Sequence, residues 1–294
     1  MLTVKNLNIY YGRKRVIENA SFTVRPGEIV GLIGPNGAGK STIMKTLLGL
    51  TKFNGSVVFN DQPITENSHQ VLQHVGALIE NPALYPFLTG LENLELYAKD
   101  KQGMHQLITT LGMDSYIAKR AGDYSIGMKQ KLGIALALLD HPDLVILDEP
   151  MNGLDIESTI LIRRIIHEYA ARGTAFLISS HVLSELQKVM TSVIILNHHR
   201  IIMDEPMAKF QRTDTSKYQL LTVDMPATER LLDQAGIHFG RQDPYLLVAA
   251  EDIDAVQRVL AAHQILLREL APRRLSFEQV IVGILRDEKA GDQQ

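Results

Sequence analysis

The feature that most constrains the fold is a glycine-rich octapeptide, Gly34-Pro35-Asn36-Gly37-Ala38-Gly39-Lys40-Ser41, which matches the pattern G-x-x-x-x-G-K-S in full. The run Glu28–Ile33 precedes it and is apolar at nearly every position, which suits a strand buried on both faces of a parallel sheet. The segment Lys40–Leu48 follows with helical character and is closed by Gly49. The chain therefore predicts strand, loop and helix in that order, which is the setting of a phosphate-binding P-loop.

The residue types of this loop suit a nucleotide. Glycines let backbone N–H groups turn inward around phosphate oxygens, and the helix that follows directs its positive end at the same anion. We expect Lys40 to reach the β and γ phosphates and the Ser41 hydroxyl to ligate Mg²⁺, with ATP and Mg²⁺ as the cofactors. The alternative, a chance glycine-rich turn, is disfavoured by the full match in this setting. The residues of this segment expected to bind ATP are Gly34, Pro35, Asn36, Gly37, Ala38, Gly39, Lys40, Ser41 and Thr42.

Two carboxylates follow a second apolar run. Leu144–Leu147 reads as a buried strand, and Asp148 and Glu149 come directly after it. In an open α/β sheet, ligands bind at the carboxyl ends of the strands. We expect Asp148 to bind the metal ion, usually through water, and Glu149 to orient or deprotonate the attacking water. A solvated acidic pair at a strand end is the alternative, and the upstream P-loop makes it the weaker one.

The rest of the chain alternates strands and helices, which predicts an α/β fold. We expect a first domain over residues 1–208, and a linker over 209–217 within the polar, aperiodic segment Glu205–Lys217. A smaller C-terminal α/β domain is expected over residues 218–294. The further strands expected are Leu2–Tyr10, Val16–Val24, Thr174–Ser180, Ser192–Leu196, Arg200–Asp204, Tyr218–Val223, Tyr245–Ala249 and Ile265–Leu270. The further helices expected are Ser158–Ala171, Ala227–Gln234, Ile253–His263 and Leu275–Leu285.

Composition removes several classes of function. The net charge is −3, which argues against a nucleic-acid-binding surface, because such a surface needs an excess of basic residues. The chain has no cysteine, so disulfide scaffolds, thiolate zinc sites and cysteine nucleophiles are excluded, and a reducing cytoplasm fits. No stretch reaches the ~18 to 20 apolar residues needed to span a bilayer. If the protein works at a membrane, another chain must span it.

The segment before the second acidic strand shows a family resemblance. Tyr124-Ser125-Ile126-Gly127-Met128-Lys129-Gln130-Lys131-Leu132 resembles, in degenerate form, the LSGGQ motif of the ATP-binding cassette (ABC) ATPases. Ser125 and Gly127 are kept, whereas positions 124, 126 and 128 depart. The resemblance covers about Met1–Asp204. It implies a P-loop nucleotide-binding domain with a RecA-like core, an antiparallel β subdomain and a helical subdomain at about residues 84–140. In the family this helix start faces the γ-phosphate held by the other subunit, although Ser125 also suits a plain helix cap.

Three further positions acquire roles through the same resemblance. Tyr11 lies where the family stacks an aromatic ring on adenine, and ordinary tyrosine packing is the alternative. Asn152-Gly153-Leu154-Asp155 resembles the D-loop that crosses to the partner subunit, while Asp155 also suits a helix cap. His181 resembles the switch histidine that contacts the γ-phosphate, against the structural role usual for a lone histidine.

Glu80 is the most informative departure from the family. The family normally carries glutamine here, on a loop that touches Mg²⁺ and the attacking water and signals to the membrane partner. Glutamate remains an oxygen ligand for Mg²⁺ but adds negative charge beside the phosphate; a neutral swap in a surface loop is the alternative. This "E-loop" and the following Tyr85–Gly90 resemble the bacitracin-resistance and lantibiotic self-immunity ATPases.

The resemblance implies a Mg-dependent ATPase that pairs with a second copy of itself and docks on a separate integral-membrane permease. It would lie in the cytoplasm at the inner face of the membrane and drive removal of a lantibiotic or bacitracin-like peptide. No nucleic-acid partner is expected. An exporter ATPase for another cargo, such as sodium, a drug or a polysaccharide, is the nearest alternative. An ABC ATPase acting on chromosomes or ribosomes is less favoured, because the chain has one P-loop and no sustained heptads. A regulatory binding module in which ATP acts as a switch without turnover is also less favoured. The chain keeps Glu149 and His181, the residues expected to support hydrolysis.

Overall fold

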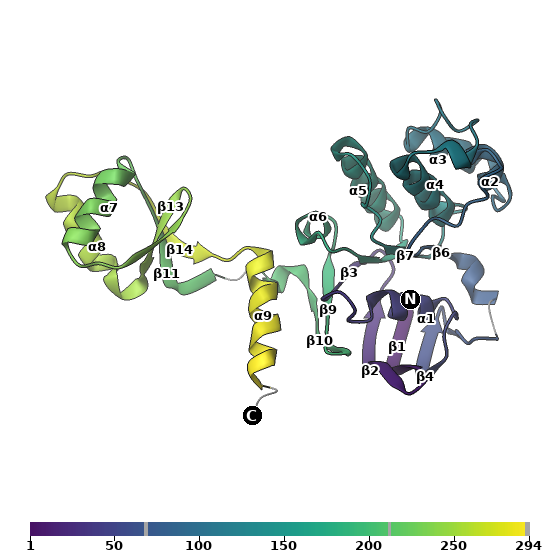
Figure 1. The fold of residues 1–294 in the computed structure, drawn as a ribbon, viewed down its shortest axis with the longest axis horizontal. Coiled ribbons are helices and arrows are strands. Elements are labelled where there is room, and N and C mark those ends of the chain that lie inside the picture. Colours follow the sequence, from purple (N-terminus) through teal and green to yellow (C-terminus); the bar gives the residue numbers. More distant parts are fainter. Residues whose placement is uncertain (68–69, 211–212, 292–294) are drawn as a thin grey trace. The chain divides into compact units, whose positions relative to one another are not determined.

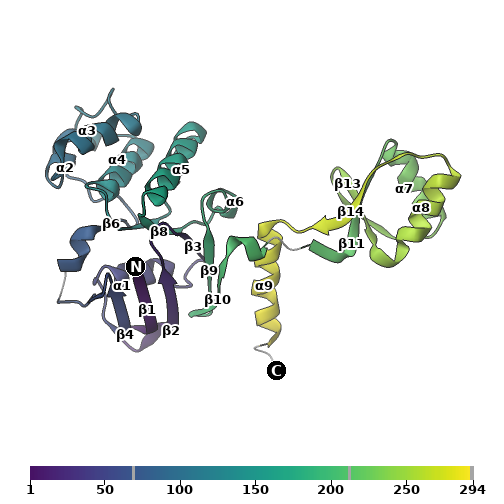
Figure 2. The same ribbon diagram turned by 180° about the vertical axis from the view of Figure 1, so that it is seen from behind.

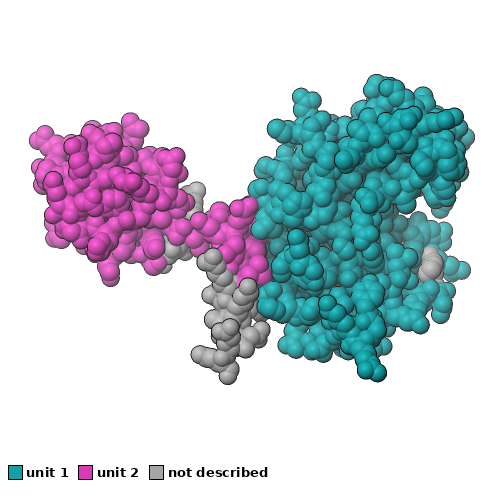
Figure 3. Space-filling model, in the orientation of Figure 1, with its two compact units in different colours: residues 1–207 teal, residues 208–294 magenta. Residues whose placement is uncertain are grey.

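The computed structural model describes residues 1–67, 70–210 and 213–291, and the chain divides into two compact units. Unit 1 is Met1–Met207 and unit 2 is Ala208–Gln294 (Figure 3). Each unit has its own hydrophobic core. The division follows Met207, one residue before the end of the domain expected from the sequence.

The centre of unit 1 is a six-stranded sheet with the strand order β10-β9-β3-β8-β7-β6. Strands β9, β3, β8, β7 and β6 run parallel, and β10 is antiparallel at one edge. Every residue of β3, β7, β8 and β9 is buried, which explains their almost uninterrupted apolar sequences. The strands span β3 Ile29–Ile33, β6 Val75–Leu78, β7 Leu144–Asp148, β8 Ala175–Ser179, β9 Ser192–Asn197 and β10 Arg200–Pro206.

A second, antiparallel sheet of unit 1 has the order β2-β1-β4-β5. Its strands alternate buried and more exposed residues, as expected when one face of a sheet meets the core. Leu2, Val4, Leu7 and Ile9 of β1 share a core with residues of β3 and of the first helix. The strands span β1 Leu2–Tyr11, β2 Lys14–Val24, β4 Phe53–Phe59 and β5 Gln62–Pro63.

The helices of unit 1 begin at residues that suit helix starts. Thr89 forms a capping box with Glu92, and Asp100, Ser125 and Asp155 cap the next three helices with side-chain oxygens. In Figures 1 and 2, α2, α3 and α4 gather together next to the β6 edge of the central sheet. The helices span α1 Lys40–Leu47, α2 Gly90–Glu95, α3 Lys101–Thr110, α4 Ile126–Leu138, α5 Ile156–Ala171 and α6 Leu183–Gln187. Short 3₁₀ helices span η1 Gln70–His74 and η2 Ala121–Asp123.

Unit 2 is built as strand, helix, strand, strand, helix, strand. Its antiparallel sheet has the order β12-β13-β11-β14, which is the split βαβ arrangement of ferredoxin-like folds. Leu220, Leu246 and Val248 of the sheet pack with Leu232 of α7 and Val256 of α8. The strands span β11 Thr213–Thr222, β12 Phe239–Gln242, β13 Tyr245–Ala249 and β14 Leu267–Arg274. The helices span α7 Met225–Gln234, η4 Ala250–Asp252, α8 Ile253–Ala262 and α9 Phe277–Gly291.

The segment Glu205–Lys217 differs from the linker expected there. Strand β10 continues to Pro206, the 3₁₀ helix η3 spans Met207–Phe210, and β11 begins at Thr213. Residues 211–212 of the expected linker lie outside the described residues. The expected linker was wrong from Thr213 onward because β11 pairs with β14, 45 to 61 residues later in the chain, and polar local sequence does not reveal such pairing. Strand β12 was also not expected.

Among the described residues, no helix combines the length and the apolar character that a membrane crossing requires.

Candidate nucleotide site

The parallel strands bring the predicted site residues to one edge of the central sheet. The register pairs Leu78 of β6 with Leu147 of β7, so Glu80 and Glu149, each two residues further on, lie at the same level. Asp148 of β7 pairs with Ser179 of β8, two residues before His181. The P-loop starts from the neighbouring strand β3. Segments separated by more than a hundred residues therefore meet at the carboxyl edge, where ligands of α/β sheets bind.

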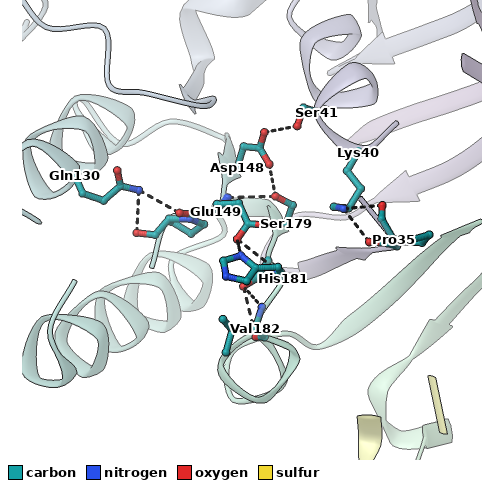
Figure 4. Close-up of polar contacts among 12 residues, drawn as sticks. Pro35, Lys40, Ser41, Gln130, Asp148, Glu149, Ser179, His181 and Val182 are labelled. Carbon is teal, nitrogen blue, oxygen red and sulfur yellow. Dashed lines mark hydrogen bonds and ion pairs between the residues drawn. The ribbon is translucent and has the colours of Figure 1, made fainter. Parts of the chain in front are cut away.

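The P-loop backbone takes conformations that only glycine adopts freely. Gly37 has φ 79° and Gly39 has φ 110°, and Gly39 is the N-cap of α1 without a side-chain hydrogen bond. The first amides of α1 thus have no capping side chain, which leaves them suited to an anion. The Lys40 ammonium donates to the carbonyl oxygens of Gly34 (2.8 Å) and Pro35 (3.2 Å), as Figure 4 shows.

The Lys40 ammonium is partly buried. Burial lowers the pKa of Lys40, and the nearby carboxylates of Glu149 and Asp148 act in the opposite direction. A desolvated ammonium gains more from a phosphate than one in bulk water, because the local dielectric is lower. Lys40 therefore presents a partly buried positive charge at the start of α1.

Asp148 is the buried anchor between the P-loop and the sheet. The Ser41 hydroxyl donates to its Oδ2 at 2.5 Å, and the Ser179 hydroxyl donates to its Oδ1 (Figure 4). Asp148 is only 5% exposed. In the described part of the chain no three histidine or acidic side chains gather into a metal cage. Mg²⁺ in phosphate-transfer sites needs only one or two protein oxygens beside phosphate and water, so the adjacent hydroxyl and carboxylate fit this ion.

Glu149 is held at both its backbone and its side chain. The backbone N–H donates to Ser179 Oγ at 3.2 Å, and the carboxylate Oε2 accepts from His181, from the backbone N–H at 3.1 Å and from ring Nδ1 at 2.7 Å. An ionised carboxylate only accepts, so the Nδ1 nitrogen carries the proton in this pair. Glu149 has φ 55°, a costly backbone conformation for a non-glycine residue that concentrates at functional sites. The two side chains are hydrogen-bonded to each other at the sheet edge.

Gln130 is a site residue to which the sequence reasoning assigned no role. It lies on α4, is 6% exposed, and its side-chain amide donates to the carbonyl oxygens of Glu149 (3.2 Å) and Pro150 (3.1 Å). The helix that begins with the LSGGQ-like segment is thereby tied to the backbone of Glu149 (Figure 4). Its burial was not readable from the sequence, because Gln130 stands between Lys129 and Lys131, and only the structure shows that its amide needs partners.

A cavity of about 550 Å³ opens at this edge. Its volume lies within the range of small-molecule sites. Part of the P-loop lines it, together with Asp148, Glu149 and Glu80. The lining residues are Val16, Asn36, Gly37, Gly39, Lys40, Ser41, Thr42, Glu80, Asn81, Asp148, Glu149 and Asn152.

Glu80 enters the cavity with a cationic partner. Its Oε1 accepts from the Lys45 ammonium at 2.6 Å, and this hydrogen bond is the main cause of the raised pKa of Lys45. Glu80 has φ 62°, so the loop after β6 turns sharply at this residue. The sequence reasoning did not include Lys45.

Ser125, Gly127 and Asp155 lie apart from this cavity. The structure supports the capping roles: Ser125 Oγ accepts from Met128 N at 3.3 Å, and Asp155 Oδ1 accepts from Ser158 N at 2.7 Å. The bond from Ser158 lowers the pKa of Asp155. The three residues instead line a separate hollow of about 350 Å³. One chain therefore presents two separate hollows, one with the P-loop and one with the LSGGQ-like helix start.

Tyr11 ends β1 and is 52% exposed, opposite Lys14 of β2. Its neighbour Tyr10 is also exposed, at 43%. Neither tyrosine is buried in the core. An exposed ring is free to stack on a base, although among the described residues it is Val16, not Tyr11, that lines the cavity from this sheet.

Comparisons with known proteins decide the family. A profile described as "ABC transporter" matches residues 17–152, which include the P-loop, the LSGGQ-like segment and Glu149. The uncharacterized ABC transporter ATP-binding protein YhcH of Bacillus subtilis (strain 168) is 34% identical over 286 residues, covering 95% of this chain and 93% of that protein. The chain belongs to the ABC transporter ATP-binding proteins. The family resemblance predicted from the LSGGQ-like segment is confirmed, and the ABC ATPase family is one that binds and hydrolyses ATP.

Other ABC relatives have named transport roles. The lantibiotic transport ATP-binding protein SrtF of Streptococcus pyogenes is 36% identical over 210 residues, covering 70% of this chain and 90% of its own. The bacitracin transport ATP-binding protein BcrA of Bacillus licheniformis is 33% identical over 250 residues, covering 83% of this chain and 81% of that protein. Among solved structures, an ATP-binding subunit of an ABC transporter matches with a TM-score of 0.67 and 30% identity, covering 71% of this chain and 91% of that one. The predicted ABC fold class is confirmed.

Proposed function

We propose that this ABC protein is the Mg-dependent ATPase subunit of a peptide-antibiotic exporter. Two contacts at the sheet edge carry the ATPase proposal: Ser41 of the P-loop bonds Asp148, and His181 bonds Glu149. This arrangement supplies a metal-binding oxygen pair and a positioned base next to a cavity large enough for a nucleotide.

The chain's own side chains divide the work. Lys40 would leave its loop carbonyls to pair with the phosphates, and Ser41 with Asp148 would hold the metal ion. Glu149 would accept a proton from the attacking water while His181 holds its carboxylate in one orientation. Mg²⁺, when bound, neutralises charge on the transferred phosphoryl group. Glu80, which lines the cavity, would supply a further oxygen ligand to the metal or its water.

A second copy of the chain completes the site in this proposal. Ser125 and Gly127 line a hollow separate from the P-loop cavity, so within one chain they are not placed against the phosphates. Two copies in head-to-tail orientation would bring each Ser125 segment and Asp155 to the partner's nucleotide. The caps of α4 and α5 then become phosphate and subunit contacts without changing their local structure.

The cargo proposal rests on relatives and on Glu80. SrtF and BcrA are named for lantibiotic and bacitracin transport, and their similarity supports a membrane-active peptide as cargo. A separate integral-membrane permease would hold the ATPase at the inner face of the membrane. An exporter ATPase for another cargo is the alternative, since relatives such as YhcH carry no cargo in their names.

The ATPase proposal is tested with Glu149→Gln. We expect ATP to bind but turnover to fall by about 100-fold or more, because a general base contributes a factor of that order. Glu157→Gln, an exposed glutamate on α5, is the matched control and should hydrolyse ATP normally. Equal turnover of Glu149→Gln and the unaltered protein would show that Glu149 is not the base.

The cargo is tested by expressing the chain together with a candidate integral-membrane permease in a peptide-sensitive host. We expect resistance to a lantibiotic or to bacitracin, and we expect Glu149→Gln to abolish it. Full sensitivity with an active ATPase, or resistance only to a drug or to sodium, would favour the alternative cargo.

A further inference from the structure

Helix α1 makes two side-chain links to the sheet edge, and only one of them is explained by the P-loop. Ser41 bonds Asp148 at the end of β7, and Lys45 bonds Glu80 just beyond β6. Residues four apart lie on the same face of a helix, so one face of α1 carries both links. The nucleotide-binding helix is therefore joined to two neighbouring strand ends at once.

The second link matters because of the charges in the cavity. The charged side chains lining it are those of Glu80, Asp148, Glu149 and Lys40, three carboxylates against one ammonium. A polyphosphate must enter this negatively charged space. Lys45 lies 2.6 Å from the Glu80 carboxylate and adds a compensating positive charge directly beside it.

The exposure of the pair suits a role at the cavity mouth. The Lys45 and Glu80 side chains are 32% and 61% exposed, so both can respond to a ligand that arrives from solvent. Lys45 donates to Oε1 of Glu80, and the second carboxylate oxygen, Oε2, can still accept from water or bind a metal ion. The left-handed backbone of Glu80 fixes the loop that presents this carboxylate.

We propose that Lys45 is the positioning and charge-balancing residue that makes a glutamate at position 80 compatible with ATP binding. It acts through Glu80, not by contact with the reacting atoms. The proposal rests on the nucleotide site proposed above and deepens it. Its consequence is that the effect of removing Lys45 depends on which residue stands at position 80.

The test is a double-mutant cycle of Lys45→Met and Glu80→Gln, read by the binding of a fluorescent ATP analogue. Binding is measured first in EDTA, where neither metal nor turnover contributes, and then with Mg²⁺. We expect Lys45→Met alone to weaken binding about three- to fivefold, the upper range for an exposed ion pair. Lys45→Met combined with Glu80→Gln should bind within about twofold of Glu80→Gln alone.

Three controls separate this role from a structural one. Lys45→Arg keeps the charge and should bind within about twofold of the unaltered protein. Lys5→Met removes an exposed lysine of β1 and should have no effect. The effect of Lys45→Met should also shrink at high salt, because exposed charges are screened. If Lys45→Met folds poorly, Lys45→Gln carries the same test with a polar side chain.

Two outcomes would overturn the proposal. Equal weakening by Lys45→Met with glutamate or glutamine at position 80 would mean that Lys45 acts independently of Glu80. No weakening in either background would mean that the ion pair has no part in binding. Neither outcome touches the ATPase proposal, which depends on Glu149→Gln and not on binding in EDTA.

Discussion

The tie between α4 and the catalytic strand gives a prediction whose size follows from the structure. Gln130→Met removes two buried hydrogen bonds, to the carbonyl oxygens of Glu149 and Pro150, while keeping a side chain of similar length. Each such bond contributes about 0.5–1.5 kcal/mol, so unit 1 should lose about 1–3 kcal/mol of unfolding free energy. For a unit of this size, a loss near 2 kcal/mol lowers the Tm by about 4–8 °C.

Gln130→Met should also slow ATP hydrolysis, because it lets the position of Glu149 change. Freed from Gln130, the Glu149 backbone can shift, and small displacements of a catalytic group are costly. We expect kcat for ATP hydrolysis to fall about tenfold or more, while KM stays within about twofold because Gln130 does not line the nucleotide cavity.

The assays are thermal unfolding of the whole protein and steady-state ATPase kinetics below the new Tm. Gln106→Met, an exposed glutamine on α3, is the matched control and should leave both quantities unchanged. A normal kcat in a destabilised Gln130→Met protein would mean that Gln130 only supports the fold. A normal Tm and a normal kcat together would refute the argument entirely.

Three further predictions concern single site elements. Tyr11→Ala should weaken ATP binding about fivefold or more and Tyr11→Phe should not, since stacking needs only the ring; equal binding by all three proteins would exclude stacking. Ser125→Ala should cost about 1 kcal/mol of stability through the lost cap of α4 and should suppress ATPase activity while leaving ATP binding by the single chain intact, as measured by equilibrium binding. Glu80→Gln should still bind ATP but change turnover or resistance; unchanged values of both would remove the special role of this loop.

A prediction of the same kind concerns unit 2. Removal of residues 208–294 should change dimerisation, ATPase rate or resistance if this unit contributes subunit contacts or regulation. Sedimentation of the shortened protein, together with the two activity assays, measures all three. No change in any of them would exclude both roles.

Sequence reasoning performed best where chemistry and local pattern coincide. The fully apolar runs at β3, β7 and β8 predicted buried parallel strands, because only a strand covered on both faces tolerates such sequences. The complete P-loop match predicted the loop between β3 and α1. Prediction from the sequence was weakest where a strand depends on a partner far away in the chain. The polar start of β11, which pairs with β14, is an example.

What the sequence determined by itself was the set of chemical groups and the order of the elements that carry them. Gly34–Ser41, Asp148 and Glu149 were identifiable from their residue types and from their positions directly after apolar runs, and His181 was identified through the family resemblance. What only the tertiary structure decided was which of these groups touch. The parallel register brings Glu80 level with Glu149, and α1 carries Lys45 onto Glu80. Such contacts depend on how strands and helices far apart in the chain pack together, and no local pattern encodes that geometry.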